Sequence, residues 1–268
     1  MPVQIVNAEH NEVDIPESFL ANNNGTIVFT GKGGSVHIGE GCHAAQIRVT
    51  IGDDCTFRVA EGCRLGAITV HTALNSTVSI GRFTGFTWTC IIQCHESFDV
   101  HIGERCLFAG NTWITVSDMH SVVDIASGRR INPGGDVRIG DHVWLGDGAA
   151  VLKGCTVGAD SVIAARAMVT KDVPPQCVAA GVPARVVRKG VNWDYSLLPV
   201  SVDDPLPGDT SPSEDGTLSE DAPPSDDIDA AAPKGSNWVR RLLLAGLGLT
   251  ATALLLAKDW PMSLALNV

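Results

Sequence analysis

A six-residue repeat is the feature that most constrains what this 268-residue chain can fold into. From residue 137 to 173 an aliphatic residue recurs at every sixth position, at Ile139, Leu145, Val151, Val157, Ile163 and Val169. An amphipathic helix would need apolar residues three or four apart, and a half-buried strand would need them to alternate. A period of six instead predicts a chain that turns a corner every six residues and stacks an aliphatic side chain inward at each corner.

Three such units would form one triangular coil, and coils would stack through parallel strand hydrogen bonds. Earlier stretches carry the same unit, an aliphatic residue followed by Gly, at Ile38, Ile51, Ile80 and Ile102. We therefore predict an all-β fold, a parallel β-helix over residues 25–195, with an N-terminal lead-in at 1–24.

Most cysteines follow this repeat. Five of them lie four residues after a repeat position: Cys42, Cys55, Cys90, Cys106 and Cys155. Small residues fill the same slot elsewhere, and a buried thiol behaves as a small hydrophobe, so we predict that these cysteines are core residues. Three others lie off the pattern: Cys63, Cys94 and Cys177. Cys90, Cys94 and His95 lack the second ligand cluster that a structural metal site needs, and we expect no metal.

One segment, residues 115–136, lacks the period and must leave the coil as an excursion loop. Long loops on rigid scaffolds commonly carry function. This loop contains Asp118, His120, Arg129 and Arg130. The two adjacent guanidinium groups could hold a substrate carboxylate, as in an acidic sugar, although an exposed pair without a ligand is the alternative.

The net charge of −11 is concentrated in one segment. Residues 196–236 hold ten acidic residues and one lysine, and they are rich in Ser, Pro and Ala, so we predict a disordered acidic linker. No basic run interleaved with aromatics indicates nucleic acid as a partner. The first residues show no signal peptide, so we expect a cytoplasmic protein with reduced thiols.

A hydrophobic segment at 237–268 follows the linker. Sixteen uncharged residues, Leu242–Ala257, would form a helix of about 24 Å, shorter than the roughly 30 Å hydrocarbon core. Arginines precede them, a lysine follows, and Trp238 and Trp260 lie where interfacial aromatics would. We expect residues 238–260 to contact the inner face of a membrane; the alternative is a helix docked on protein.

The stretch from Ile102 to Trp193 resembles the hexapeptide-repeat acyltransferases, in particular the sugar and capsular polysaccharide O-acetyltransferases. The matching pieces are Ser117-Asp118-Met119-His120, IGDHVWLG from 139, KGCTVGADSVIAARAMVTKDVP from 153 and AAGVPARVVRK from 179. This resemblance implies a left-handed coil, a homotrimer, and transfer of an acetyl group from acetyl-CoA to a hydroxyl of a sugar or polysaccharide.

The resemblance also implies residue roles. His120 would be the general base, because a sugar hydroxyl is a poor nucleophile until a group accepts its proton, and imidazole titrates near neutral pH. Trp144 would line the acceptor side of the reaction centre, near donors for the oxyanion. Acetyl-CoA would lie along a groove between subunits and contact Gly146, Ala165, Thr170, Lys171, Arg185 and Lys189. Asn111 and Asp118 are assigned to the acceptor together with Arg129 and Arg130.

Three other functions are alternatives to sugar O-acetylation: the first stays open, and the sequence disfavours the other two. A small-molecule, drug-type acetyltransferase would carry the same motifs. A non-catalytic trimeric β-helix scaffold tethered to a membrane would have no need for a loop bearing His120. A metal-dependent hydratase on the same coil would need two histidines five residues apart, and none of the eight histidines are so spaced.

Overall fold

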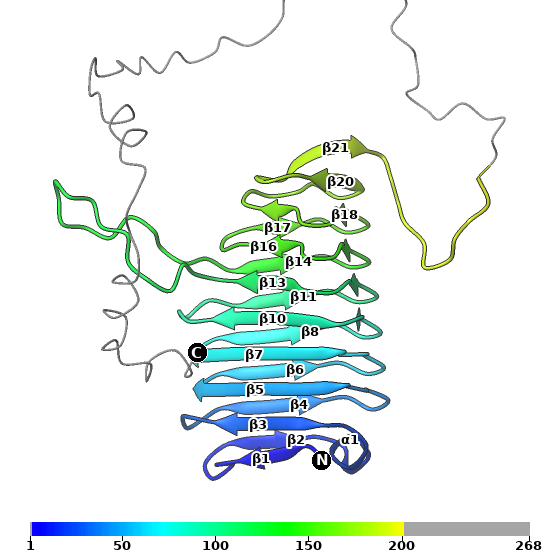
Figure 1. Cartoon of the computed structure of the whole chain (residues 1–268). Helices are drawn as coiled ribbons and strands as arrows, with labels where there is room; N and C mark the ends of the chain where they lie inside the picture. Colours follow the sequence, from blue (N-terminus) through cyan, green and yellow to red (C-terminus); the bar gives the residue numbers. More distant parts are fainter. Residues whose placement is uncertain (1, 201–268) are drawn as a thin grey trace, which may run out of the picture. The chain divides into compact units, whose positions relative to one another are not determined.

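The computed structural model describes residues 2–200, which form a three-sided prism of stacked strands (Figure 1). The first side is an 8-stranded sheet of β1 (Gln4–Val6), β3 (Gly25–Phe29), β5 (Gln46–Asp53), β7 (Ala67–Leu74), β10 (Thr89–Cys94), β13 (Thr112–Thr115), β16 (Ala150–Val151) and β19 (Met168–Val169). The second is a 7-stranded sheet of β2 (Glu12–Asp14), β4 (Ser35–Ile38), β6 (Thr56–Val59), β8 (Thr77–Ile80), β11 (Val100–Ile102), β14 (Val137–Ile139) and β17 (Thr156–Val157). The third is a 6-stranded sheet of β9 (Gly85–Phe86), β12 (Leu107–Phe108), β15 (Trp144–Leu145), β18 (Val162–Ile163), β20 (Cys177–Ala180) and β21 (Arg185–Lys189).

Neighbouring strands within each sheet are parallel, except that β21 returns antiparallel to β20 at the end of the prism. The six repeat residues from Ile139 to Val169 are all buried, with at most 3% of any of them exposed. The period of six therefore arises because each strand presents one aliphatic side chain to the prism interior before the chain turns. The predicted all-β parallel β-helix is confirmed.

The coil begins earlier than the repeat indicates. Within residues 1–24, β1 pairs with β3 and β2 pairs with β4, and the short helix α1 (Glu17–Asn22) covers the end of the prism with Phe19 buried. These first strands are three residues long and carry no aliphatic-Gly unit, so the periodicity does not reveal them.

All eight cysteines are free and buried. Cys63 and Cys177 each lie four residues after a buried valine, so they continue the pattern that the other five follow. Cys94 differs because it lies two residues after the buried Ile92, at the end of β10, and not four residues after a repeat position. Burial raises the pKa of Cys90 and of Cys94 to about 12, so these thiols behave as core side chains.

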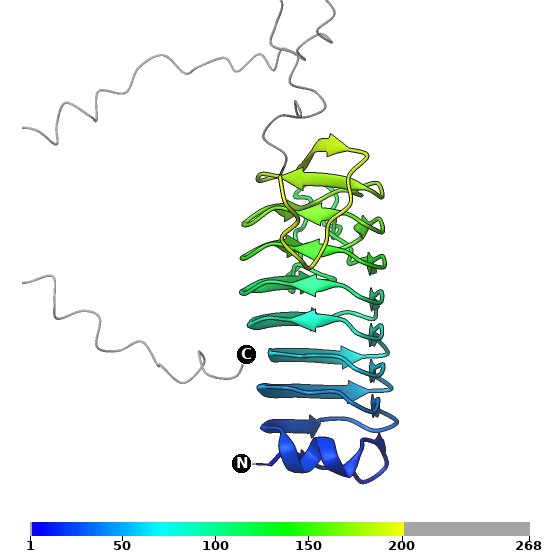
Figure 2. The same cartoon turned by 90° about the vertical axis from the view of Figure 1, so that its right-hand side faces the viewer.

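Two segments lie outside the prism wall. Residues 116–136 project from the corner where β13 ends and β14 begins (Figure 1). After β21 the chain crosses back over the 6-stranded sheet (Figure 2). Residues 201–268, with most of the predicted linker, the hydrophobic segment and the membrane contact, lie outside the described residues; within 2–200 no helix has the length and apolar character to cross a membrane.

Candidate active site

The excursion is an irregular hairpin. Val123 and Arg130 form an antiparallel bridge, and Ile131 N–H donates to the carbonyl of Val122. Asp124 closes the tip, because its carboxylate accepts hydrogen bonds from the backbone N–H and the hydroxyl of Ser127. The segment therefore has its own hydrogen-bonded geometry as it leaves the prism.

His120 lies near the base of this hairpin with its side chain exposed. The chain reaches it through a buried turn in which the hydroxyl of Ser117 accepts a hydrogen bond from the N–H of Met119 at 3.2 Å. His120 N–H donates to the carbonyl of Asp118 at 2.7 Å, and its own carbonyl accepts from Asn132 at 2.8 Å. The backbone around the imidazole is thus fixed, while the ring is free to meet a ligand.

Two ion pairs fasten the hairpin to the prism. The Arg130 guanidinium binds Glu96 with both terminal nitrogens, at 2.6 and 2.8 Å. Asp118 binds Lys153 from the turn after β16 and also accepts from Asn132. Arg130 lowers the pKa of Glu96, and Lys153, followed by Asn132, lowers that of Asp118. Both carboxylates therefore stay ionised at neutral pH and hold the loop.

This arrangement separates the two arginines expected to act together. The guanidinium of Arg130 binds Glu96, and that of Arg129 takes no part in this contact. Arg130 is thus occupied within the described chain, and Arg129 is left exposed for a ligand. Asp118 is likewise engaged, and Asn111 lies apart at a corner, where its amide donates to Asp147 at 3.4 Å.

Trp144 lies on the 6-stranded sheet, within an aromatic cluster. Trp193, from the segment after β21, stacks on His142 with ring centroids 4.3 Å apart and lies 5.9 Å from Trp144. The Trp193 indole N–H donates to the His142 carbonyl at 2.7 Å, and Tyr195 packs edge-on against Trp193. Trp144 remains 38% exposed, so it lines an open surface.

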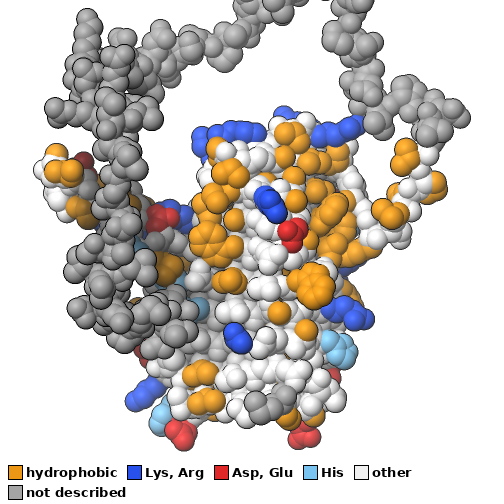
Figure 3. Space-filling view, in the orientation of Figure 1, with side chains coloured by type: hydrophobic (Ala, Val, Ile, Leu, Met, Phe, Trp, Pro, Cys, Tyr) orange, Lys and Arg blue, Asp and Glu red, His pale blue; other side chains and the backbone are white. Residues whose placement is uncertain are grey.

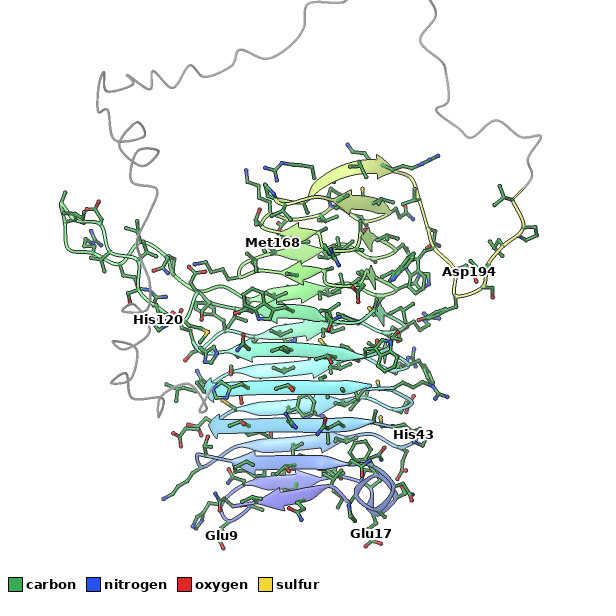
Figure 4. All side chains as sticks on the ribbon, viewed as in Figure 1. Glu9, Glu17, His43, His120, Met168 and Asp194 are labelled. Atoms are coloured by element: carbon green, nitrogen blue, oxygen red, sulfur yellow. The ribbon has the colours of Figure 1, made fainter. Side chains whose placement is uncertain are left out.

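Within one chain the two proposed reaction-centre residues do not meet. His120 projects from the corner between the 8-stranded and 7-stranded sheets, whereas Trp144 belongs to the 6-stranded sheet. Figure 4 labels His120 on one side of the prism and Asp194, which follows Trp193, on the other. His120 and Trp144 therefore lie on different sides of the prism.

The residues assigned to acetyl-CoA line the upper coils. Gly146 and Ala165 are adjacent, because a Cβ on Gly146 would lie 2.5 Å from the Ala165 nitrogen, so only glycine fits that corner. Thr170 and Lys171 follow β19, and Arg185 and Lys189 belong to β21; all four are exposed. The Ala184 N–H donates to the Met168 carbonyl, which connects β19 to the start of β21.

The sequence reasoning missed several residues of this region: Glu96, Asn132, Lys153, Trp193 and Tyr195. Lys153 begins one of the matched motifs, but the motif gives no sign that it pairs with Asp118, and the other four lie outside the matched pieces. Each acts on a residue far away in the sequence, as Glu96 and Arg130 do across 34 positions. The presence of a polar amide in an aperiodic loop, Asn132, was the only available signal.

Two histidines lie close together near Glu96. His71 belongs to β7, and His95 follows the end of β10, directly before Glu96. The two rings have centroids 4.7 Å apart, and the buried Nε2 of His95 has no hydrogen-bond partner. Burial lowers the pKa of both imidazoles, and His71 lowers that of His95 further. Both rings are therefore neutral at pH 7.

Hollows on the surface of the described chain lie elsewhere. One of about 450 Å³ lies over the 7-stranded sheet beside Asp14, His37 and Arg58, and another of about 250 Å³ lies near Gln4 and Arg48. Neither includes a predicted site residue. Among residues 2–200, no group of three or more His, Cys, Asp or Glu side chains is placed to hold a metal ion.

The fold defines a class of protein, the left-handed parallel β-helices built from hexapeptide repeats. A family model described as bacterial transferase hexapeptide (six repeats) matches residues 136–171. The polysialic acid O-acetyltransferase of Neisseria meningitidis is 30% identical over 148 residues, which cover 54% of this chain and 67% of that protein. The chain belongs to the hexapeptide-repeat acyltransferase family.

Three further likenesses extend this result. The galactoside O-acetyltransferase of Escherichia coli (strain K12) is 35% identical over 127 residues, or 45% of this chain and 58% of that protein. The chain spans only 32% of a polysialic acid O-acetyltransferase of Escherichia coli O1:K1, which is 34% identical over 98 residues, or 37% of this chain. The crystallographic structure of the polysialic acid O-acetyltransferase OatWY superimposes with a TM-score of 0.58 at 26% identity, covering 76% of this chain and 97% of that chain.

Proposed function

We propose that this protein is an O-acetyltransferase that moves an acetyl group from acetyl-CoA to a hydroxyl of a sugar, in a capsular or other surface polysaccharide or its precursor. The observation that carries the proposal is the exposed imidazole of His120, held by a hydrogen-bonded backbone at the one break in the repeat. The family fold and the relatives, two of them named polysialic acid O-acetyltransferases, support the same reaction.

In this reaction His120 acts as the general base. Its imidazole accepts the proton of the sugar hydroxyl as the hydroxyl oxygen attacks the thioester carbonyl. The carbon–sulfur bond then breaks, the acetyl group stays on the sugar, and the proton passes to the departing CoA thiolate. Ala165 is exposed beside Gly146, and its backbone N–H could bind the developing oxyanion or the pantetheine arm. The Gly146 N–H already donates to the carbonyl of Ile163, so Gly146 would contribute by letting the backbone of Ala165 lie close to it. Lys171, Arg185 and Lys189 are exposed cations suited to the CoA phosphates.

We further propose a homotrimer in which His120 of one subunit faces Trp144 of the partner subunit. His120 and Trp144 lie on different sides of one chain, and this separation supports the assembly. The hairpin carries exposed apolar side chains, among them Ile125 at 100% exposure, which a neighbouring subunit would cover. Exposed Ile91 and Trp113, paired across β10 and β13, add an apolar area on the 8-stranded sheet (Figure 3).

We place the enzyme in the cytoplasm, at the inner face of the membrane through residues 238–260. Surface polysaccharides and their precursors would be reachable there. Three weak anchors on one trimer would reinforce one another through their effective concentration.

The first test measures release of the CoA thiol from acetyl-CoA with a panel of sialic, uronic and neutral sugar acceptors and a hydroxyl-bearing drug. His120→Ala should lower turnover by about 10²- to 10⁴-fold, the usual contribution of a general base. His43→Ala is the matched control, because His43 is exposed on another part of the prism (Figure 4). Equal turnover of the His120→Ala variant and wild type would remove His120 from this role.

The second test examines the shared site. His120→Ala and Trp144→Ala subunits are each expected to be poorly active, and they are unfolded together, mixed and refolded. In random trimers about a quarter of the sites would combine an intact His120 with an intact Trp144, so about a quarter of the wild-type rate should return. A mixture no more active than the separate variants would contradict a site shared between subunits.

A further inference from the structure

We propose that Asn132 is a positioning residue that fixes the backbone of His120 relative to the prism. This inference rests on the proposed function of His120 and adds a residue to that site. Asn132 lies on the returning arm of the excursion hairpin, twelve residues after His120.

The amide of Asn132 uses its full hydrogen-bonding capacity within the loop. Its Nδ2 donates to Asp118 Oδ2 at 2.8 Å and to the carbonyl of His120 at 2.8 Å. Its Oδ1 accepts from the backbone N–H of Val122 at 2.7 Å and from Nε of Arg130 at 3.2 Å. A primary amide offers two donors and two acceptor lone pairs, so all four positions are satisfied.

These four partners surround the proposed base on both sides in the sequence. Asp118 precedes His120 by two residues, Val122 follows it by two, and the third contact is to the His120 carbonyl itself. One planar amide therefore sets the course of the chain from 118 to 122. A general base has to be held within roughly 0.5 Å of its productive position, which an unsupported loop would not achieve.

The same amide joins the two attachments of the loop to the prism. Asp118 is bound to Lys153, after β16, and Arg130 is bound to Glu96, after β10. Both partners of Asn132 are thus anchored on the rigid coils. Asn132 connects the anchors to the His120 carbonyl, and its loss would leave both ion pairs and the bond from His120 N–H to Asp118, but no contact that fixes the His120 carbonyl and Val122.

Only an amide of this length satisfies the arrangement. Aspartate has the same shape, but it replaces two donors by lone pairs and would place a second carboxylate beside Asp118. Alanine removes all four contacts. Both Asn132→Ala and Asn132→Asp should therefore free the segment, and the loss in the Asp variant would show that the donors, rather than the size, are required.

The first measurement is independent of activity. Amide hydrogen exchange followed by mass spectrometry should rise in the peptide containing residues 118–122 of both Asn132 variants. Ser127→Ala is the matched control, because it removes a side-chain contact at the hairpin tip without touching His120 or Asn132. Unchanged exchange around His120 in the Asn132 variants would overturn the proposal, whatever the enzyme does.

The second measurement uses turnover. Asn132→Ala should lower kcat by about 10²-fold, the effect of misplacing a catalytic group by about 1 Å, with the KM for acetyl-CoA little changed. In the His120→Ala background the same substitution should have almost no effect, because Asn132 acts through His120. Independent, multiplying losses would contradict a positioning role. If wild type itself releases no CoA thiol with any acceptor, the proposed function fails, and the exchange result still decides the contact.

Discussion

At the scale of single residues, the contact between His71 on β7 and His95 directly after β10 predicts that the stability of the protein depends on pH. The rings of His71 and His95 pack against each other at an angle of 37° in a half-buried position, and they cannot both be protonated without repulsion and loss of hydration. In the folded chain the pKa of each imidazole therefore lies below its ordinary value of 6.5. Glu96, which anchors the excursion, follows His95 directly, so this sensitivity lies at the base of the loop.

We predict that stability falls as the pH is lowered through the ordinary imidazole pKa of about 6.5 and below it. Because the folded pKa values lie below those of the unfolded chain, the unfolded chain takes up protons first as the pH drops below about 6.5, which favours unfolding. Urea unfolding at several pH values should show this slope, and His95→Gln should reduce it. His43→Gln, at an exposed site, is the comparison. The explanation fails if His95→Gln keeps the full wild-type slope.

At the scale of elements, the segment after β21 is held to the 6-stranded sheet by a few aromatic contacts. Trp193 stacks on His142 and donates to its carbonyl, and the Tyr195 hydroxyl donates to the carbonyl of Arg105 at 2.8 Å. This segment covers part of the surface beside Trp144, so its attachment determines how exposed that surface is.

Trp193→Ala should release this segment locally while the prism stays folded. One stacking contact and one hydrogen bond contribute about 1–3 kcal/mol together, so local opening should rise roughly tenfold or more. Hydrogen exchange or limited proteolysis over residues 190–196 would measure it. Tyr195→Phe, which removes only the hydroxyl contact, should have a smaller effect. Comparable protection in wild type and Trp193→Ala would indicate that other contacts hold the segment.

The sequence predicts those elements whose residues repeat at a fixed interval, and it does not predict contacts between residues far apart in the chain. The hexads predict the strands from Ile139 to Val169, because every inward residue repeats at a fixed interval. The excursion is predicted as a break in that interval. The partners within it are not, since Glu96–Arg130 and Asp118–Lys153 join residues 34 and 35 positions apart with no spacing rule. The same reasoning paired Arg129 with Arg130, which the hairpin separates.

At the scale of the whole molecule, every thiol is enclosed by the stacked coils. All eight cysteines are buried, and burial raises the pKa of Cys106 and Cys155 to about 11. Cys42 differs, because a hydrogen bond from Cys63 lowers its pKa to about 7, but it is only 4% exposed. Since each coil packs on its neighbours alone, these thiols become reachable only when coils separate.

The native protein should therefore react with fewer than one equivalent of a thiol reagent on the timescale of an assay. The same reagent should count eight thiols in concentrated guanidinium chloride. This measurement also provides the background value for the CoA-release assay, because the cysteines of the native enzyme would not react with the thiol reagent. Rapid labelling of several thiols without denaturant would mean that the coils open more readily than the buried core implies.

The strand ladder continues across the excursion as if those residues were missing. Val100 and Ile102 of β11 pair with Val137 and Ile139 of β14, while β13 pairs with β16 on the adjacent sheet, all in unbroken register. The pairing of the strands thus depends on where the two ends of the excursion lie and not on its length. A loop from another acetyltransferase that begins and ends at the same two positions could therefore replace it and change the acceptor, while the coils above, which would bind the donor, stay the same.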